Sequence, residues 1–252
     1  MLLALLIACG PKHLPTPVPS DPATLIARAR AEAVPGPQIA HFTIRIETPD
    51  GTISALGTGI FAAPNRFRVE LRGPIGPAQL TAASDGHRVT AFILGKNTAY
   101  VGEDAEAAVR SWTGGAAGLD AVVSLLLGRL PELGTPSSVT PMPTWSRADG
   151  AVVRIALDGT TAHLVRVEVI DAAGVPGLTA NYAPAAFPAH LDIDLPALHA
   201  KAAVDYSDWQ TGAPPDAAFT VFIPPGATII PINTASIAPD ALPTPPAPPP
   251  SP

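Results

Sequence analysis

The sequence predicts a mainly β protein with helices, built on a curved antiparallel sheet, and three observations lead to this fold class. Two long stretches alternate apolar and polar residues with the period of two that half-buried strands require. Two segments of helical length, the second nearly all apolar, separate those stretches. Turn signals recur at short intervals, as they do in a meander whose strands are joined by hairpins.

Length and composition favour one β-rich domain with an apolar surface or cavity. At 252 residues the chain can form one substantial core. Hydrophobic residues make up 47% and charged residues 14%, against about 25% charged in ordinary soluble proteins. The net charge of −6 and the presence of only three lysines (Lys12, Lys96, Lys201) leave no basic stripe, so nucleic acid is not an expected partner.

The N-terminus resembles a lipoprotein signal peptide followed by a tether. Residues 1–8 are almost wholly apolar, and an aliphatic Leu6 and a small Ala8 precede Cys9, although no Lys or Arg precedes the run. The resemblance implies cleavage before Cys9 and a diacylglyceryl group on its thiol. Residues 9–21, rich in proline, then form a flexible tether. The alternative is a buried free cysteine in an N-terminal strand.

A first helix is expected to begin at Asp21 and to end near Pro35. Ser20 or Asp21 can cap it, and Pro22 suits its first turn. The apolar residues lie at helical spacing on one side: Leu25, Ile26, Ala29 and Ala33. This helix therefore has one face to bury.

Strands are expected from there to about residue 100. Their apolar positions alternate with Thr, Arg and Glu and so face one side of a sheet: Phe42, Ile44 and Ile46, then Phe67, Val69 and Leu71. Turn signals fall at 49–51, 63–65, 73–76 and 85–86. A sheet that grows in this way, strand by strand, curls.

Two helices are then expected, at 103–112 and 119–130. The second is apolar all round, so it must be buried or must cover something apolar. After a Pro-rich connection at 136–143, strands return at 151–157, 163–170, 178–182, 190–195 and 202–206, with a last strand at 219–223. The folded domain is expected to span 22–232, and 233–252 reads as a Pro-rich disordered tail.

The residues offer no catalytic or metal-binding constellation. Residues 57–62 fit a dinucleotide fingerprint on paper, but a proline and a new strand follow where that motif needs a helix. Asp192 and Asp194 share a strand face without a third ligand at fixed spacing. The six histidines are scattered, with no nucleophile elbow. We therefore expect that the protein is not an enzyme and that it uses no cofactor and no metal.

Several segments together resemble the outer-membrane lipoprotein receptor LolB family, within a wider LolA/LolB-like superfamily. They are Phe67-Arg-Val-Glu-Leu-Arg-Gly-Pro-Ile-Gly-Pro-Ala-Gln-Leu, Glu103-Asp-Ala-Glu, Trp112-Thr-Gly, Leu126-Leu-Gly-Arg-Leu-Pro, Phe187-Pro-Ala-His-Leu-Asp-Ile and Asp205-Tyr-Ser-Asp-Trp. The order of elements is similar as well, from about residue 23 to 209. The chain departs from the family in continuing past the Trp segment with 219–230 and the tail.

The resemblance implies a half-open curved antiparallel β-barrel, plugged by helices, whose apolar interior takes up the acyl chains of lipoproteins. The residues expected to line that cavity are Phe42, Ile44, Ile46, Phe61, Phe67, Val69, Leu71, Leu125 and Leu126. A loop that delivers cargo to the bilayer corresponds to Pro74 and Ile75. The alternative there is a tight turn whose Ile75 packs back into the core.

Two functions remain open at this point. The first is a lipid-anchored protein of the cell envelope, at the outer membrane facing the periplasm, that binds acyl chains of lipoproteins or other lipids. Its partners would be a periplasmic carrier and the membrane that holds its anchor. The second is a structural or assembly lipoprotein whose barrel is filled by its own side chains and acts through protein–protein contacts.

Overall fold

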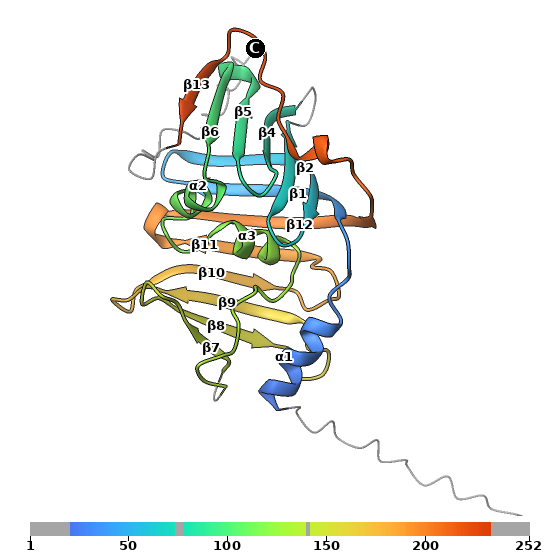
Figure 1. Cartoon of the computed structure of the whole chain (residues 1–252), viewed down its shortest axis with the longest axis vertical. Coiled ribbons are helices and arrows are strands. Elements are labelled where there is room, and N and C mark those ends of the chain that lie inside the picture. Colours follow the sequence, from blue (N-terminus) through green and yellow to red (C-terminus); the bar gives the residue numbers. More distant parts are fainter. Residues whose placement is uncertain (1–20, 74–77, 140–141, 233–252) are drawn as a thin grey trace, which may run out of the picture.

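A computed structural model describes residues 21–73, 78–139 and 142–232, and these form one curved sheet with helices on one face (Figure 1). This confirms the predicted fold class. The thirteen strands are β1 (Gln38–Thr48), β2 (Gly51–Ala62), β3 (Arg66–Arg72), β4 (Ala78–Ser84), β5 (Val89–Ile93), β6 (Thr98–Gly102), β7 (Thr144–Ser146), β8 (Val152–Leu157), β9 (Leu164–Ile170), β10 (Pro176–Tyr182), β11 (His190–Leu195), β12 (Ala200–Thr211) and β13 (Thr228–Pro231). The α-helices are α1 (Pro22–Ala31), α2 (Ala105–Trp112) and α3 (Leu119–Leu126), and short 3₁₀ turns occupy Leu94–Lys96, Pro196–Leu198 and Asp216–Phe219.

The sheet consists of two antiparallel meanders that meet along one seam. Its order is β13-β6-β5-β4-β3-β2-β1-β12-β11-β10-β9-β8-β7, so β1 pairs with β12 and joins the first half of the chain to the second. Hairpins at the predicted turns 49–51 and 63–65 connect β1 to β2 and β2 to β3. The sheet is strongly twisted, as the large angle between strands β4 to β6 and strands β8 to β11 shows (Figure 1).

Helix α1 forms as the local residues dictate. The Asp21 carboxylate accepts hydrogen bonds from the backbone N–H groups of Ala23 and Thr24 at 3.0 and 3.1 Å, and a proline begins the helix. Leu25 and Ile26 are the residues that it buries. The helix ends at Ala31, a turn before the predicted stop near Pro35.

Two glycines on β2 make room for aromatic rings on the inner face, the face that α3 covers. A Cβ atom at Gly57 would collide with the ring of Phe42, and one at Gly59 would collide with the ring of Phe61. Both rings are buried, with Phe42 6% and Phe61 1% exposed. The Gly-Thr-Gly spacing therefore serves strand packing.

Helices α2 and α3 lie across the inner face, in front of the middle strands (Figure 1). Helix α2 packs closely on β6, where a Cβ at Gly102 would meet Ala108. Helix α3 is shorter than the predicted 119–130, because the chain turns at Gly128, which has a φ of +64°. Two tyrosines hold its last turn, since Tyr182 and Tyr206 donate hydrogen bonds to the carbonyl oxygens of Leu125 and Leu126 at 3.0 and 3.1 Å.

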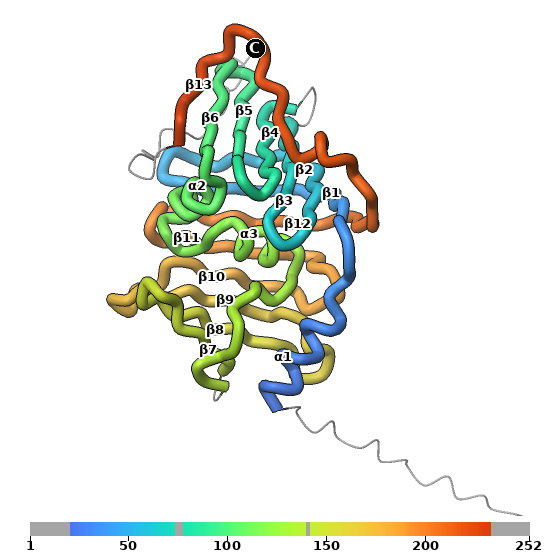
Figure 2. Tube along the Cα trace, viewed as in Figure 1, coloured from blue at the N-terminus to red at the C-terminus, as the bar shows by residue number. Residues whose placement is uncertain are grey.

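The expected last strand at 219–223 is wrong. Phe219 ends a 3₁₀ turn, and Val221 and Ile223 pack against Phe92, Ala99 and Val101 on the outer face of β5 and β6. The extended stretch lies further on, in β13, which pairs in parallel with β6. We call residues 212–232 the C-terminal strap. It leaves the end of β12, passes the first meander and adds an edge strand to it (Figure 2).

The short strand β7 was missed, because three residues are too few for a periodic signal. It pairs with β8 at the other edge of the sheet. In the part of the chain that the structure describes, no helix combines the length and the hydropathy needed to cross a bilayer.

Candidate functional site

The residues predicted to line an acyl cavity mostly form a packed cluster. Phe42, Phe61, Phe67 and Leu125 are buried in the main core, and Ile44, Val69, Leu71 and Leu126 are partly buried against it. Ile46 is half-buried further along β1. The structure therefore brings eight of the nine side chains into one cluster, with α3 on one side and β1 to β3 on the other.

A hollow of about 250 Å³ opens beside this cluster, between the helices and the second meander. Its walls come from α3, from the segment after it and from β8 and β9, and most of them are aliphatic or small: Ala116, Ala117, Gly118, Ala121, Leu125, Pro131, Leu133, Val153, Val167 and Val169. Leu125 is the residue that it shares with the predicted cavity. We call this the inner hollow.

The remaining wall residues of the inner hollow were not predicted, although the sequence carried a signal for them. Val167 and Val169 alternate with Arg166 and Glu168 along β9, which is the same period-two pattern that marked β1 and β3. The signal in β8 is weaker, because only Arg154 separates Val153 from the next inward-facing residue and the rest of the strand is apolar. Alternation predicts which residues face inward. It does not predict which of them pack against helix side chains and which of them line an unfilled hollow.

Five charged residues surround the mouth of the inner hollow: Glu106, Arg110, Asp120, Glu132 and Arg147. Glu106 links the two helices, because its Oε2 accepts a hydrogen bond from the backbone N–H of Leu119 at 2.6 Å and its Oε1 accepts one from Arg110 at 2.7 Å. It thereby supplies the side-chain acceptor that Gly118, at the start of α3, cannot provide.

Arg147 fixes the opposite side of that mouth. Its guanidinium donates to the carbonyl oxygen of Ala116 at 2.7 Å and to Asp149 at 2.5 Å. Asp149 also lies 3.9 Å from Arg110. The two arginines are thus engaged by Glu106 and Asp149, and they hold the loop between the helices to the β7–β8 turn.

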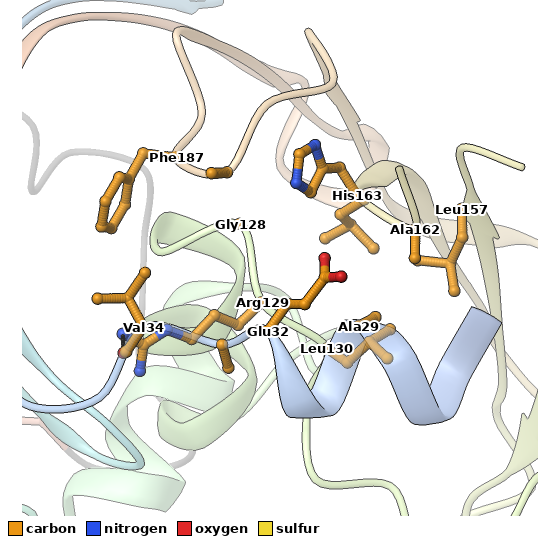
Figure 3. Close-up of a pocket in the computed structure, with 13 residues that line it drawn as sticks. Ala29, Glu32, Val34, Gly128, Arg129, Leu130, Leu157, Ala162, His163 and Phe187 are labelled. Atoms are coloured by element: carbon orange, nitrogen blue, oxygen red, sulfur yellow. Dashed lines mark hydrogen bonds between the residues drawn. The ribbon is translucent and has the colours of Figure 1, made fainter. Parts of the chain in front are cut away.

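A second, smaller hollow of about 90 Å³ lies where α1 meets the second meander (Figure 3). Phe187, Leu130 and Leu157 line it together with polar groups. Burial lowers the pKa of the Arg129 guanidinium, which donates a hydrogen bond to the carbonyl oxygen of Val34. The buried Nδ1 of His163 has no hydrogen-bond partner among the described residues. This hollow is more polar and smaller than the inner hollow, so it is less suited to a hydrocarbon chain.

The outer face of the sheet carries a third hollow, of about 300 Å³, with charged walls. Arg45, Glu47, Asp194 and Lys201 surround small residues of β12 there. Its polarity makes it unsuitable for an acyl chain.

Three of the predicted functional residues cannot be placed. Cys9, Pro74 and Ile75 lie outside the described residues. The lipid anchor and the delivery loop therefore stay predictions.

Comparison with known proteins identifies the fold. A domain from Vibrio parahaemolyticus, named for outer membrane lipoprotein sorting, matches with a TM-score of 0.51 and 11% identity over 77% of this chain and 94% of its own. A DUF1329 family protein from Desulfovibrio piger matches with a TM-score of 0.52 and 9% identity over 80% and 98%. A LolA superfamily protein from Nitrosomonas europaea has a TM-score of 0.49 and 14% identity over 80% and 98%.

No protein-family model and no curated protein matches the sequence. At the identities of the two solved structures that match at TM-scores of 0.51 and 0.52, the similarity establishes a shared fold. That fold agrees with the curved antiparallel sheet and helices expected from the sequence.

Proposed function

We propose that this protein is a lipid-anchored envelope protein that binds the acyl chains of lipoproteins or other lipids in the inner hollow. In this proposal Cys9 carries the anchor after removal of residues 1–8, and residues 9–21 act as a tether. Residues 22–232 form the LolB-like binding domain, and 233–252 form a tail. The protein receives its cargo from a periplasmic carrier and passes it to the outer membrane, with Pro74 and Ile75 in the delivery loop.

The observation that carries the proposal is an aliphatic hollow on the helix-covered face of this curved sheet. Each methylene transferred from water into such a site contributes about 0.8 kcal/mol. At roughly 30 Å³ per water molecule, a hollow of about 250 Å³ has room for about eight waters, and so for a short length of one chain. Because the lining is mainly aliphatic, we propose binding rather than catalysis.

A second candidate is a structural or assembly lipoprotein that acts through protein–protein contacts. The packed cluster favours it, because eight of the nine side chains expected to line a cavity lie in or against the core, and only Leu125 among them also lines the inner hollow. On this alternative the inner hollow is a packing defect and takes up no ligand.

The two candidates differ in whether the hollow accepts a hydrocarbon. We would titrate the purified protein with N-phenyl-1-naphthylamine, an uncharged probe that fluoresces in apolar surroundings, and then displace it with a triacylated lipopeptide. We expect saturable binding and displacement. The variant Val167→Phe, which fills the wall of the hollow, is expected to bind the probe about four- to fifteenfold more weakly if the phenyl ring displaces one or two methylenes of ligand.

The matched control is Val175→Phe, the same substitution at a turn position that is 55% exposed. Thermal unfolding of both variants shows whether they remain folded. Equal binding by wild type, V167F and V175F, or no saturable binding by the wild type, would reject the inner hollow as the site and favour the assembly function.

A further inference from the structure

The mouth of the inner hollow carries unbalanced negative charge. Its carboxylates are Glu106, Asp120 and Glu132, with Asp149 behind them, and they face the guanidiniums of Arg110 and Arg147. Glu106 and Asp149 are paired with those arginines. Among the residues that the structure describes, Asp120 and Glu132 have neither an ion-pair partner nor a side-chain hydrogen bond, so two carboxylates remain unneutralised.

These carboxylates are close enough to affect one another. Partial burial, followed by the charges of Glu106 and Glu132, raises the pKa of Asp120 above its usual value. All three acidic side chains belong to segments that form the rim, with Asp120 in the first turn of α3 and Glu132 on the segment that follows that helix. A polar group at the end of a chain inserted in the hollow would lie among them.

We propose that the inner hollow selects acyl or alkyl chains with a cationic, ammonium-bearing head group. The inference rests on the proposed function, because it concerns the polar end of the ligand whose hydrocarbon the hollow would hold. An ammonium group offsets one of the two unpaired charges of Asp120 and Glu132 and can donate hydrogen bonds to both, whereas a carboxylate or phosphate adds further negative charge. Free fatty acids are therefore poor ligands, and alkylamines or other lipids that carry an ammonium group are good ones.

The experiment compares three ligands with the same chain and different head groups. Dodecylammonium, dodecanol and dodecanoate, each below its micellar concentration at pH 8 and low ionic strength, displace N-phenyl-1-naphthylamine from the full-length protein. Because both unpaired carboxylates attract an ammonium and repel a carboxylate, we expect dodecylammonium to displace the probe at a concentration roughly tenfold or more below that of dodecanoate. Dodecanol is expected to fall between them.

Charge-neutral variants identify the residues responsible. Asp120→Asn with Glu132→Gln is expected to make the three ligands equal to within about twofold, because it removes both unpaired charges and keeps the side-chain shapes. The control is Glu47→Gln with Asp194→Asn, which removes two carboxylates from the hollow on the outer face. It changes the net charge by the same amount and is expected to retain the preference for the amine.

The outcomes separate the two proposals. Displacement by all three ligands at similar concentrations, a preference for dodecanoate, or an amine preference that survives in D120N/E132Q would overturn the head-group inference and leave acyl binding intact. A loss of preference in E47Q/D194N would overturn it as well, because the effect would then belong to the overall charge. If none of the ligands displaces the probe, the proposed function itself fails.

Discussion

At the scale of single residues, the histidine that begins β11 shows how cross-strand neighbours set local electrostatics. Asp192, which shares a strand face with Asp194, is one of the residues that contact it. On the outer face, His190 lies between two carboxylates, with its Nδ1 2.6 Å from Asp205 and its Nε2 3.1 Å from Asp192. The cross-strand register of β11 and β12 brings His190 opposite Asp205, fifteen residues away in the chain.

His190 is expected to make stability depend on pH. The hydrogen bond to Asp205, against the opposing effect of burial and with the help of Asp192, raises the pKa of the ring above its usual 6.5. Because the pKa of His190 is higher in the folded protein than in the unfolded chain, its ion pairs stabilise the fold fully below about pH 6.5. This contribution is lost as the pH rises through the pKa of the folded state. Because the ring is 39% exposed, the gain is at most about 1 kcal/mol.

Urea unfolding of the wild type and His190→Gln between pH 5.5 and 9 measures this contribution. The difference in unfolding free energy is expected to be largest at pH 5.5, to shrink as the pH rises and to weaken in high salt. A difference that grows with pH would show that the two carboxylates do not stabilise the protonated ring.

At the scale of elements, the C-terminal strap extends the sheet beyond what the family resemblance covers. Arg68 donates hydrogen bonds to the carbonyl oxygens of Ala218 and Thr220 at 3.3 and 2.9 Å. Arg66 lies over the ring of Phe219, 4.7 Å from its centre. The strap thus covers the outer face of the first meander and protects the edge of β6, which would otherwise be open to pairing.

Two phenylalanines of the strap test whether it belongs to the folded core. Phe219 is 2% exposed and Phe222 is 79% exposed. We expect Phe219→Ala to lower the free energy of unfolding by about 3–5 kcal/mol, because it removes a buried ring and leaves a cavity. Phe222→Ala is expected to change it by less than about 0.5 kcal/mol. Denaturant titration measures both, and equal effects of the two variants would show that the strap does not pack as described.

At the scale of the whole molecule, the seam between β1 and β12 makes the two meanders one structure. Aromatic rings line its inner side, since Phe42 and Tyr206 pack at 5.7 Å and Tyr206 and Trp209 at 4.8 Å between ring centres. Trp209 also stacks on Phe187 at 5.0 Å, and its indole N–H donates to the carbonyl oxygen of Pro188 at 3.1 Å. This cluster stabilises the strand pairing on which the continuous sheet depends.

Trp209→Ala is therefore expected to destabilise both halves together. We expect a loss of about 2–4 kcal/mol, since the side chain is partly buried and its removal leaves a carbonyl group without its donor. Hydrogen exchange should become faster in β4 to β6 and in β8 to β10 alike. The control, Gln210→Ala, alters an exposed neighbour and should change stability by less than about 0.5 kcal/mol. Faster exchange confined to one meander would show that the halves unfold separately.

Local sequence signals were sufficient to predict most of the strands, the cap of α1 and the inward-facing residues of β1 and β3. Each depends on neighbours a few residues away, through period-two alternation, a capping carboxylate or a turn signal. The strand wrongly placed at 219–223 shows the limit of such signals, because its apolar residues pack on an outer face that only a distant part of the chain creates.

The position of the inner hollow depends on tertiary packing and could not be predicted from the sequence. The large rings of Phe42 and Phe61 fill the first meander beneath α3, and glycines at 57 and 59 admit them, while the smaller valines of β8 and β9 leave the inner hollow open. Tertiary structure also brought Asp120 and Glu132 to its rim. Alternation specifies which side of a strand a residue faces, but the volume left unfilled depends on all the side chains that meet there from opposite elements.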